Sequence, residues 1–190
     1  EEVRKPMGML KRDHIKTMLQ MDRIADLWQK KYGRAWNEQD VDALYVLFEE
    51  KLFAILDQFA DVKPYVKETV TALREKGIKI GSTTGYTDAM MTIVAPKAAE
   101  NGYAPDAWFS PDAVGHKGRP YPYMIYKNME ALGISSAEDV VKVGDTISDI
   151  KEGKHAGVYT IGVIEGSSEL GLSQKEYEAL SDVEKQEKAK

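Results

Sequence analysis

The stretch KVGDTISDIKEGKHAG, residues 142–157, joins a strand to a helix through a polar turn. Valines alternate before the turn, and helix-favouring residues follow Thr146 as far as Gly157, which favours a helix end. Asp145 directly follows the strand, and Asp149 lies one helical turn later. Two such carboxylates are ligands that suit Mg²⁺. In a second interpretation, Asp145 and Thr146 only cap the helix, and Asp149 favours its positive end.

Around this stretch, helical and strand patterns alternate with short connections from residue 64 onward. Helices are predicted over 64–77, 87–102, 121–133 and 148–157, and strands over 78–85, 107–111, 139–145 and 159–166. This alternation predicts an α/β fold, in which a parallel sheet is covered by helices on both faces.

The first third of the chain has a different pattern. Apolar residues recur at helical spacing from residue 11 to residue 58, and Asn37 is suited to cap a helix there. Strand signals are absent from this part, so the sequence predicts a small helical bundle. The charged segment 172–190 is predicted to be helical and exposed.

The charge and the residue composition argue against several classes of protein. The 190 residues carry a net charge of −5 and contain no cysteine, which argues against a nucleic-acid partner and excludes disulfides and thiolate zinc sites. No apolar run approaches the roughly 20 residues of a membrane helix. We therefore expect a cytoplasmic protein that contacts neither nucleic acid nor membrane.

Three polar clusters follow predicted strands or precede predicted helices: residues 82–85, 117–120 and 144–149. Ligands of open parallel sheets bind at the carboxyl ends of the strands. Thr84 and Gly85 offer hydroxyl and backbone N–H donors to a phosphate group, and Arg119 offers a guanidinium. Taken singly, each cluster is equally consistent with a helix-capping turn or a surface arginine.

The order of these clusters resembles the second, third and fourth motifs of the haloacid dehalogenase superfamily and, within it, the phosphonatases. The resemblance rests on five stretches that span most of the chain: RKPMGMLKRDH, GIKIGSTTGYT, GRPYPYMIYKNMEALG, VGDTISDIKEG and GVIEGSSELGL. It implies a Rossmannoid parallel-sheet core over residues 61–190, lacking its first strand, and part of a small helical cap domain over residues 1–60.

The resemblance also implies a reaction, the hydrolysis of phosphonoacetaldehyde to acetaldehyde and phosphate. Lys11 occupies the place of the lysine that forms an imine with the substrate aldehyde. Through a protonated imine the leaving group departs as an enamine rather than as an enolate. This role requires an unprotonated amine, so we expect Lys11 to be desolvated or close to other cations. His14, within one helical turn, is expected to assist proton transfer. Without the motif match, Lys11 would be interpreted as a solvated lysine.

Other roles follow by the same match. Mg²⁺ is the implied cofactor, with Asp145 as its ligand and Asp149 as a further or indirect ligand. The residues expected to face or bind the substrate are Met7, Thr84, Gly85, Tyr86 and Arg119. Similar enzymes pair as homodimers through their cap helices, and the apolar faces between residues 15 and 56 are compatible with such pairing.

One superfamily motif has no counterpart in the sequence. The first motif is a strand followed by DxxGT, and it carries the nucleophilic aspartate. It is expected some forty residues before Lys11, where the sequence has no room for it, and residues 1–10 contain no aspartate. We therefore expect a truncated chain that is inactive by the family route and less stable, since the missing strand is central to the sheet.

Two alternatives remain open at this point. A generic phosphatase or phosphomutase of the same superfamily would need no imine, so its activity would survive replacement of Lys11. A non-catalytic remnant that binds phosphate or phosphonate ligands would explain the missing nucleophile. The joint retention of Lys11, Arg119 and the two aspartates argues against such a remnant.

Overall fold

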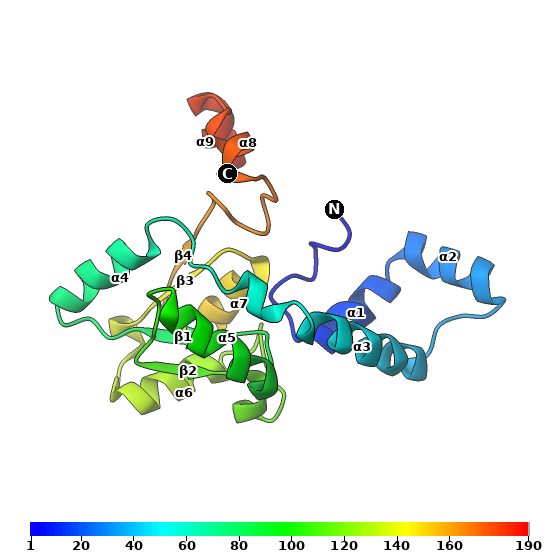
Figure 1. Cartoon of the computed structure of the whole chain (residues 1–190), viewed down its shortest axis with the longest axis horizontal. Coiled ribbons are helices and arrows are strands. Elements are labelled where there is room, and N and C mark those ends of the chain that lie inside the picture. Colours follow the sequence, from blue (N-terminus) through cyan, green and yellow to red (C-terminus); the bar gives the residue numbers. More distant parts are fainter. Residues whose placement is uncertain (190) are drawn as a thin grey trace.

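The computed structural model describes residues 1–189, so the last residue of the predicted core and tail lies outside the described residues. Helices and strands alternate between residues 66 and 162, and the segments on either side contain helices (Figure 1). The α-helices are α1 (Lys11–Leu19), α2 (Asp22–Tyr32), α3 (Glu38–Phe53), α4 (Val66–Glu75), α5 (Asp88–Glu100), α6 (Tyr123–Leu132), α7 (Ile147–Ala156), α8 (Gln174–Glu178) and α9 (Asp182–Lys188). The strands are β1 (Gly81–Thr83), β2 (Ala107–Phe109), β3 (Val141–Gly144) and β4 (Tyr159–Gly162), and short 3₁₀ turns occupy Leu56–Phe59, Pro111–Val114 and Ala137–Asp139.

Helices α1, α2 and α3 extend to one side of the part that contains the strands (Figure 1). Helix α3 begins with a full capping box: the Asn37 side chain accepts a hydrogen bond from the backbone N–H of Asp40, and the Asp40 carboxylate accepts one from the N–H of Asn37. Such reciprocal bonds satisfy two otherwise unpaired donors. Asn37 is therefore confirmed as the N-cap, and the helical prediction for this part agrees with the structure.

The strands differ from the single sheet that the pattern predicts. In residues 1–189, β1 pairs in parallel with β2, β3 pairs in parallel with β4, and no ladder joins the two pairs. Side chains bridge the gap instead, because the Lys142 ammonium donates to the Thr83 hydroxyl over 2.8 Å. Residues 78–80 were predicted to be strand, but pairing begins only at Gly81.

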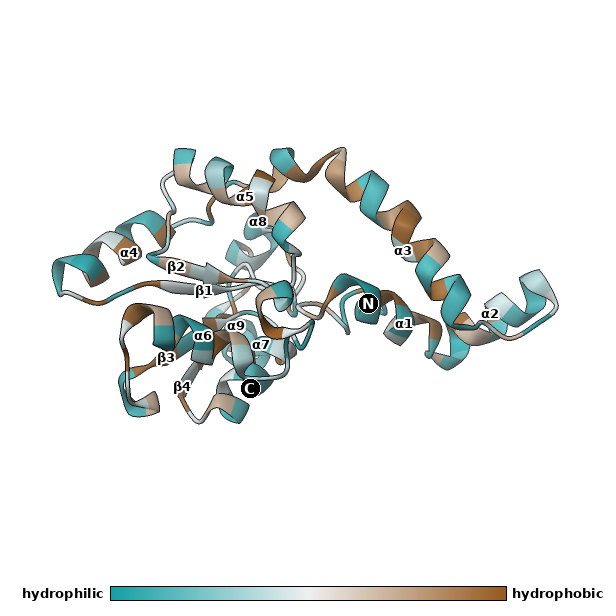
Figure 2. Cartoon of the chain, turned by 90° about the horizontal axis from the view of Figure 1, so that it is seen from below, coloured by the Kyte–Doolittle hydropathy of each residue, from teal (hydrophilic) through white to brown (hydrophobic). Residues whose placement is uncertain are grey.

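Helices cover the strands unequally. Helices α5 and α6 lie on opposite sides of β1 and β2, while α7 packs against β3 and β4 (Figures 1 and 2). A small core of Ile125, Ala156 and Val158 joins α6 to α7. The apolar side chains on the other face of β3 and β4 are between 53% and 67% exposed: Val141, Val143, Tyr159 and Ile161. Among residues 1–189, helices thus lie on both sides of β1–β2 but on one side of β3–β4.

Segments that position the site converge at one end of the strands. The turn after β1 carries residues 84–87, the turn after β3 carries Asp145 and Thr146, and the start of α1 approaches both. Thr146 caps α7 and forms a capping box with Asp149, as the second interpretation of this turn predicted. No helix in the described part of the chain is long and apolar enough to cross a membrane.

Candidate active site

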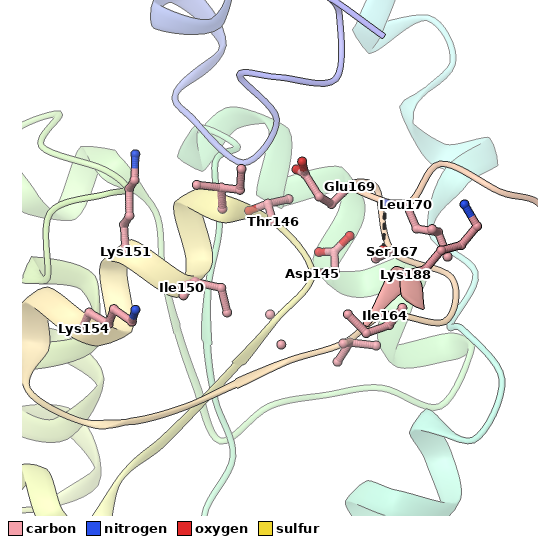
Figure 3. Close-up of a pocket in the computed structure, with 14 residues that line it drawn as sticks. Asp145, Thr146, Ile150, Lys151, Lys154, Ile164, Ser167, Glu169, Leu170 and Lys188 are labelled. Atoms are coloured by element: carbon pink, nitrogen blue, oxygen red, sulfur yellow. Dashed lines mark hydrogen bonds between the residues drawn. The ribbon is translucent and has the colours of Figure 1, made fainter. Parts of the chain in front are cut away.

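The segment before α1 packs directly onto the two polar turns. A Cβ atom added to Gly8 would lie 2.5 Å from the Thr146 hydroxyl oxygen, and one added to Gly85 would lie 2.9 Å from the carbonyl oxygen of Met9. Gly8 also has φ +81°, a conformation that residues with a Cβ rarely adopt. In Figure 3 this segment approaches Thr146 from above. Glycine at positions 8 and 85 therefore lets the helical part approach the strand ends closely, and Met7, half-buried, is placed beside this contact.

Lys11 is the first residue of α1, so its position follows from this packing. Its ammonium lies over the ring of Tyr86, 5.2 Å from the ring centroid. Burial and the positive charge of Arg119 together lower the pKa of Lys11. No carboxylate lies within 4.0 Å of its Nζ among residues 1–189. An amine in such surroundings has a larger unprotonated fraction than a solvated lysine.

His14 lies one turn further along α1 and is 9% exposed. Its pKa is lowered by burial and by the charge of Lys11, an effect that the backbone of Val3 partly opposes. Its Nδ1 is buried and has no hydrogen-bond partner within the described residues. A neutral imidazole one helical turn from an amine can accept or return a proton, and the role of His14 in proton transfer stays a prediction.

Arg119 is held by three groups at the strand ends. Its Nη2 donates to the carbonyl oxygen of Thr83 over 2.6 Å, and its Nη1 lies 3.0 Å from Oδ1 of Asp149. Its Nε lies 3.5 Å from Oε2 of Glu152. Nε is buried and makes no hydrogen bond within the described residues, whereas Nη1 and Nη2 each keep one N–H group beyond these contacts for an incoming anion. The predicted cation is therefore oriented by protein oxygens.

The buried pair Lys142 and Glu152 was missed by the motif analysis. The Lys142 ammonium lies 2.9 Å from Asp149 and 2.9 Å from Glu152, and Glu152 also accepts from the Thr83 hydroxyl over 2.9 Å. Two signals point to this pair in the sequence. Lys142 alternates with outward valines on β3, and Glu152 follows Asp149 by three residues on α7 and so shares its helix face.

We call the four side chains Arg119, Lys142, Asp149 and Glu152 the buried ion cluster. Its two cations and two carboxylates balance in charge. Burial raises the pKa of Asp149, but the charges of Arg119 and Lys142, with a hydrogen bond from Thr146, hold this pKa below the usual value of an aspartate. Asp149 is therefore ionised at neutral pH.

The two predicted metal ligands have different surroundings. Both oxygens of Asp149 already accept protein donors: Oδ1 faces the two cations, and Oδ2 faces Thr146. Asp145 accepts one bond, from the backbone N–H of Ser168 over 2.7 Å. No group of three or more His, Asp or Glu in the described part of the chain is placed to hold a metal. Since Mg²⁺ needs only one or two carboxylates besides water, Asp145 fits a direct ligand and Asp149 an indirect one.

The other residues that were predicted to face the substrate lie at or near the turn after β1. The Thr84 hydroxyl accepts the backbone N–H of Tyr86 over 3.1 Å, so its own proton is free to be donated. Burial raises the pKa of Tyr86, which keeps the phenol neutral. Gly85 and Met7 lie where the segment before α1 packs against the turn after β1. The structure thus brings the predicted residues together, although their roles stay predictions.

A separate cavity opens beside Asp145. Its walls are largely apolar, with Ile150, Ile164 and Leu170 among the residues that line it (Figure 3). Lys11, Tyr86 and Arg119 do not line this cavity. It therefore shares Asp145 and Thr146 with the candidate site but is not lined by Lys11.

Comparison with known proteins identifies the family. A family model described as haloacid dehalogenase-like hydrolase matches residues 4–157. The chain belongs to this family. The family resemblance and the haloacid dehalogenase-like fold expected from the motifs are thereby confirmed, as is the expectation of a hydrolase.

Within this family, the chain is similar to proteins that are named as phosphonoacetaldehyde hydrolases. The chain is 56% identical over 187 residues to a phosphonoacetaldehyde hydrolase of Lysinibacillus sphaericus, covering 98% of this chain and 70% of the relative. It is 54% identical to a bifunctional phosphonoacetaldehyde hydrolase/aminoethylphosphonate transaminase of Clostridioides difficile, covering 97% of this chain and 29% of that protein. A crystal structure of a phosphonoacetaldehyde hydrolase-like protein from Oleispira antarctica superposes with a TM-score of 0.90 at 38% identity, covering 98% of this chain and 67% of that one.

Proposed function

We propose that this haloacid dehalogenase-like hydrolase acts on phosphonoacetaldehyde and binds it as an imine on Lys11. The observation that carries the proposal is the environment of Lys11: an amine with a lowered pKa, over the Tyr86 ring, next to a cation and without a paired carboxylate. The names of relatives that are 53–56% identical support the same substrate.

The chemistry of Lys11 begins with attack of the neutral amine on the aldehyde carbon. Water leaves, and a protonated imine forms. This cation accepts the electron pair of the P–C bond while the phosphoryl group passes to an oxygen acceptor, so the carbon fragment departs as an enamine. We assign to His14 the uptake and return of protons at the amine and at the departing oxygen. Hydrolysis of the product imine then releases acetaldehyde and restores Lys11.

In this proposal, hydrogen-bond donors at the ends of the strands bind the phosphonate. Arg119 has two N–H groups left, and the hydroxyl of Thr84 and the backbone at Gly85 add uncharged donors. When bound, Mg²⁺ supplies positive charge to the phosphoryl oxygens, with Asp145 as the proposed ligand and Asp149 acting indirectly. The cleavage of the P–C bond requires a phosphoryl acceptor. The family resemblance implies an aspartate after a first strand for this role, and that assignment stays a prediction.

Pairing of two chains forms a further part of the proposal. Helix α3 exposes Val46, Leu47 and Phe48 by 64%, 59% and 36%. Exposed apolar side chains in one helix favour association, so we propose a homodimer through the α1–α3 helices. The predicted cytoplasmic location, with no nucleic-acid or membrane partner, stays a prediction.

The test compares two aldehydes. The protein is incubated with phosphonoacetaldehyde, or with propanal as an aldehyde without the phosphonate, and reduced with borohydride, and the intact mass is measured. We expect one adduct with phosphonoacetaldehyde at concentrations where propanal gives none. Lys11→Arg should give no adduct, whereas Lys16→Arg, on the same helix, should react like the parent. An ordinary phosphatase would show no preference for phosphonoacetaldehyde and no dependence on Lys11.

A further inference from the structure

Lys11 differs from the other buried lysine near the site. The ammonium of Lys142 is surrounded by Asp149, Glu152 and the Thr83 hydroxyl, all within 2.9 Å, which favours its protonated form. Lys11 has an aromatic face and a cation nearby, and no carboxylate of the described residues pairs with it. The reactive amine is therefore fixed at one point, close to an anion-binding guanidinium.

An imine at this point can accept electrons from bonds other than P–C. A 3-oxo carboxylate carries a carbonyl carbon two bonds from its anionic group, as phosphonoacetaldehyde does. It could therefore react with the same amine while its anionic group binds the same guanidinium. When such an imine loses its carboxylate, the group departs as CO₂, which is itself a neutral, stable molecule. This step therefore requires no acceptor group and no metal. Release of a phosphoryl group requires an acceptor.

We propose that the chain decarboxylates 3-oxo carboxylates, with 3-oxopropanoate as the simplest substrate, through an imine on Lys11. The proposal rests on the proposed function, because it uses the same imine. It adds a substrate class whose carboxylate takes the place of the phosphonate at Arg119. A carboxylate also suits the planar fork of a guanidinium.

The steps balance without a further reagent. The Lys11 amine adds to the aldehyde carbon and expels water, which gives the protonated imine. The C–C bond to the carboxylate breaks, CO₂ leaves, and the electron pair forms the C=C bond of an enamine. A proton returns to the terminal carbon, with His14, which lies one turn along α1, as the proposed donor, and water then hydrolyses the imine. The sum is 3-oxopropanoate plus one proton giving acetaldehyde and CO₂.

Burial favours the bond-breaking step. The carboxylate loses its negative charge as CO₂ forms, so a site that excludes water destabilises the reactant more than the transition state. The side chains that surround the amine are removed from solvent: Tyr86 is partly buried, and the Arg119 side chain is 11% exposed. The close contact of Gly8 and Gly85 with neighbouring backbone and side chains leaves little space for water on that side.

The experiment measures acetaldehyde formed from 3-oxopropanoate, with alcohol dehydrogenase and NADH as the readout and the rate in buffer subtracted. We expect a protein-dependent rate that is lost entirely in Lys11→Arg. Lys16→Arg is the matched control, because Lys16 is a half-buried lysine of α1 that pairs with Glu38 over 2.6 Å. Circular dichroism of each variant verifies folding.

A parallel borohydride reduction with phosphonoacetaldehyde separates the two proposals. If Lys11 forms that adduct but 3-oxopropanoate reacts no faster than in buffer, the decarboxylase inference is overturned and the proposed function stands. If Lys11→Arg keeps the decarboxylation rate, the inference is also overturned. If the folded parent forms no adduct with phosphonoacetaldehyde, the proposed function fails together with the inference.

Discussion

The guanidinium of Arg119 and the carboxylate of Asp149 are 3.0 Å apart in a buried ion pair. One residue was predicted to bind the substrate anion and the other to contribute to the metal site, so the two functions meet in one charge cluster. Lys142 and Glu152 complete it, and Glu152 is fully buried. Binding of a phosphonate at Arg119 therefore changes the electrostatic environment of Asp149 directly.

Removal of the Lys142 charge should destabilise the fold. Lys142→Met leaves two buried carboxylates facing Arg119 alone, and breaking a buried ion pair costs about 3–5 kcal/mol. Urea unfolding followed by circular dichroism measures the change. The control is Lys151→Met, an exposed lysine of α7, which should change the free energy of unfolding by less than about 0.5 kcal/mol. Equal stability of the two variants would show that the buried ion cluster is not a structural unit.

The Mg²⁺ assignment makes Asp145 the sensitive position. We expect MgCl₂ to raise the thermal unfolding midpoint of the parent, because a ligand that binds the folded state stabilises it. Asp145→Asn should lose this rise, since an amide is a weaker ligand for a hard cation than a carboxylate. Asp139→Asn, at an exposed aspartate before the same strand, should keep the rise. A full rise in Asp145→Asn would exclude Asp145 as the ligand.

Gly8 should tolerate no side chain. Gly8→Ala adds a Cβ in contact with the Thr146 hydroxyl at a positive φ, whereas Gly33→Ala has a positive φ with nothing within 4 Å. The conformational cost of about 1–2 kcal/mol is common to both. Overpacking adds about 1–3 kcal/mol in Gly8→Ala alone. Urea unfolding should therefore rank Gly8→Ala as the less stable variant, and its reaction at Lys11 should also slow. Equal destabilisation would contradict the close contact described for Gly8.

The pH dependence of imine trapping follows from the lowered pKa of Lys11. Burial and the charge of Arg119 lower this pKa, and protonation of His14 adds a further positive charge, while Tyr86 stays neutral. The protonated amine does not attack, so the trapping rate should rise with pH and level off below the ordinary lysine pKa of about 10.4. Labelling of exposed lysines in the same sample should continue to rise. A Lys11 profile that matches theirs would contradict the pKa shift.

Local sequence signals predicted most elements of the fold. Asn37 and Thr146 are capping residues in the sequence and in the structure, and β3 followed by α7 appears where the opening motif placed it. The single sheet could not be derived from local pattern. Strand pairing depends on which strands are present side by side. In the described residues no ladder joins β1 to β3, and the side chains of Thr83 and Lys142 form a hydrogen bond between them.

For the site, motif order located the residues but not their partners. Lys11 lies over Tyr86, 75 positions away in sequence, because the segment before α1 packs on the turn after β1. Nothing local in either segment specifies that contact. The role of Glu152 was missed because a glutamate in a charged helix is usually solvated, and only the fold reveals that it is fully buried.

The most direct test of the central claim, an imine on Lys11, is a peptide map of the borohydride-reduced adduct. The parent is treated with phosphonoacetaldehyde at neutral pH, reduced and digested, and each lysine-containing peptide is quantified by mass spectrometry. The account predicts that the label is concentrated on the peptide that contains Lys11 and is absent there in Lys11→Arg. Label spread over the exposed lysines of a folded chain, with no excess at Lys11, would contradict it.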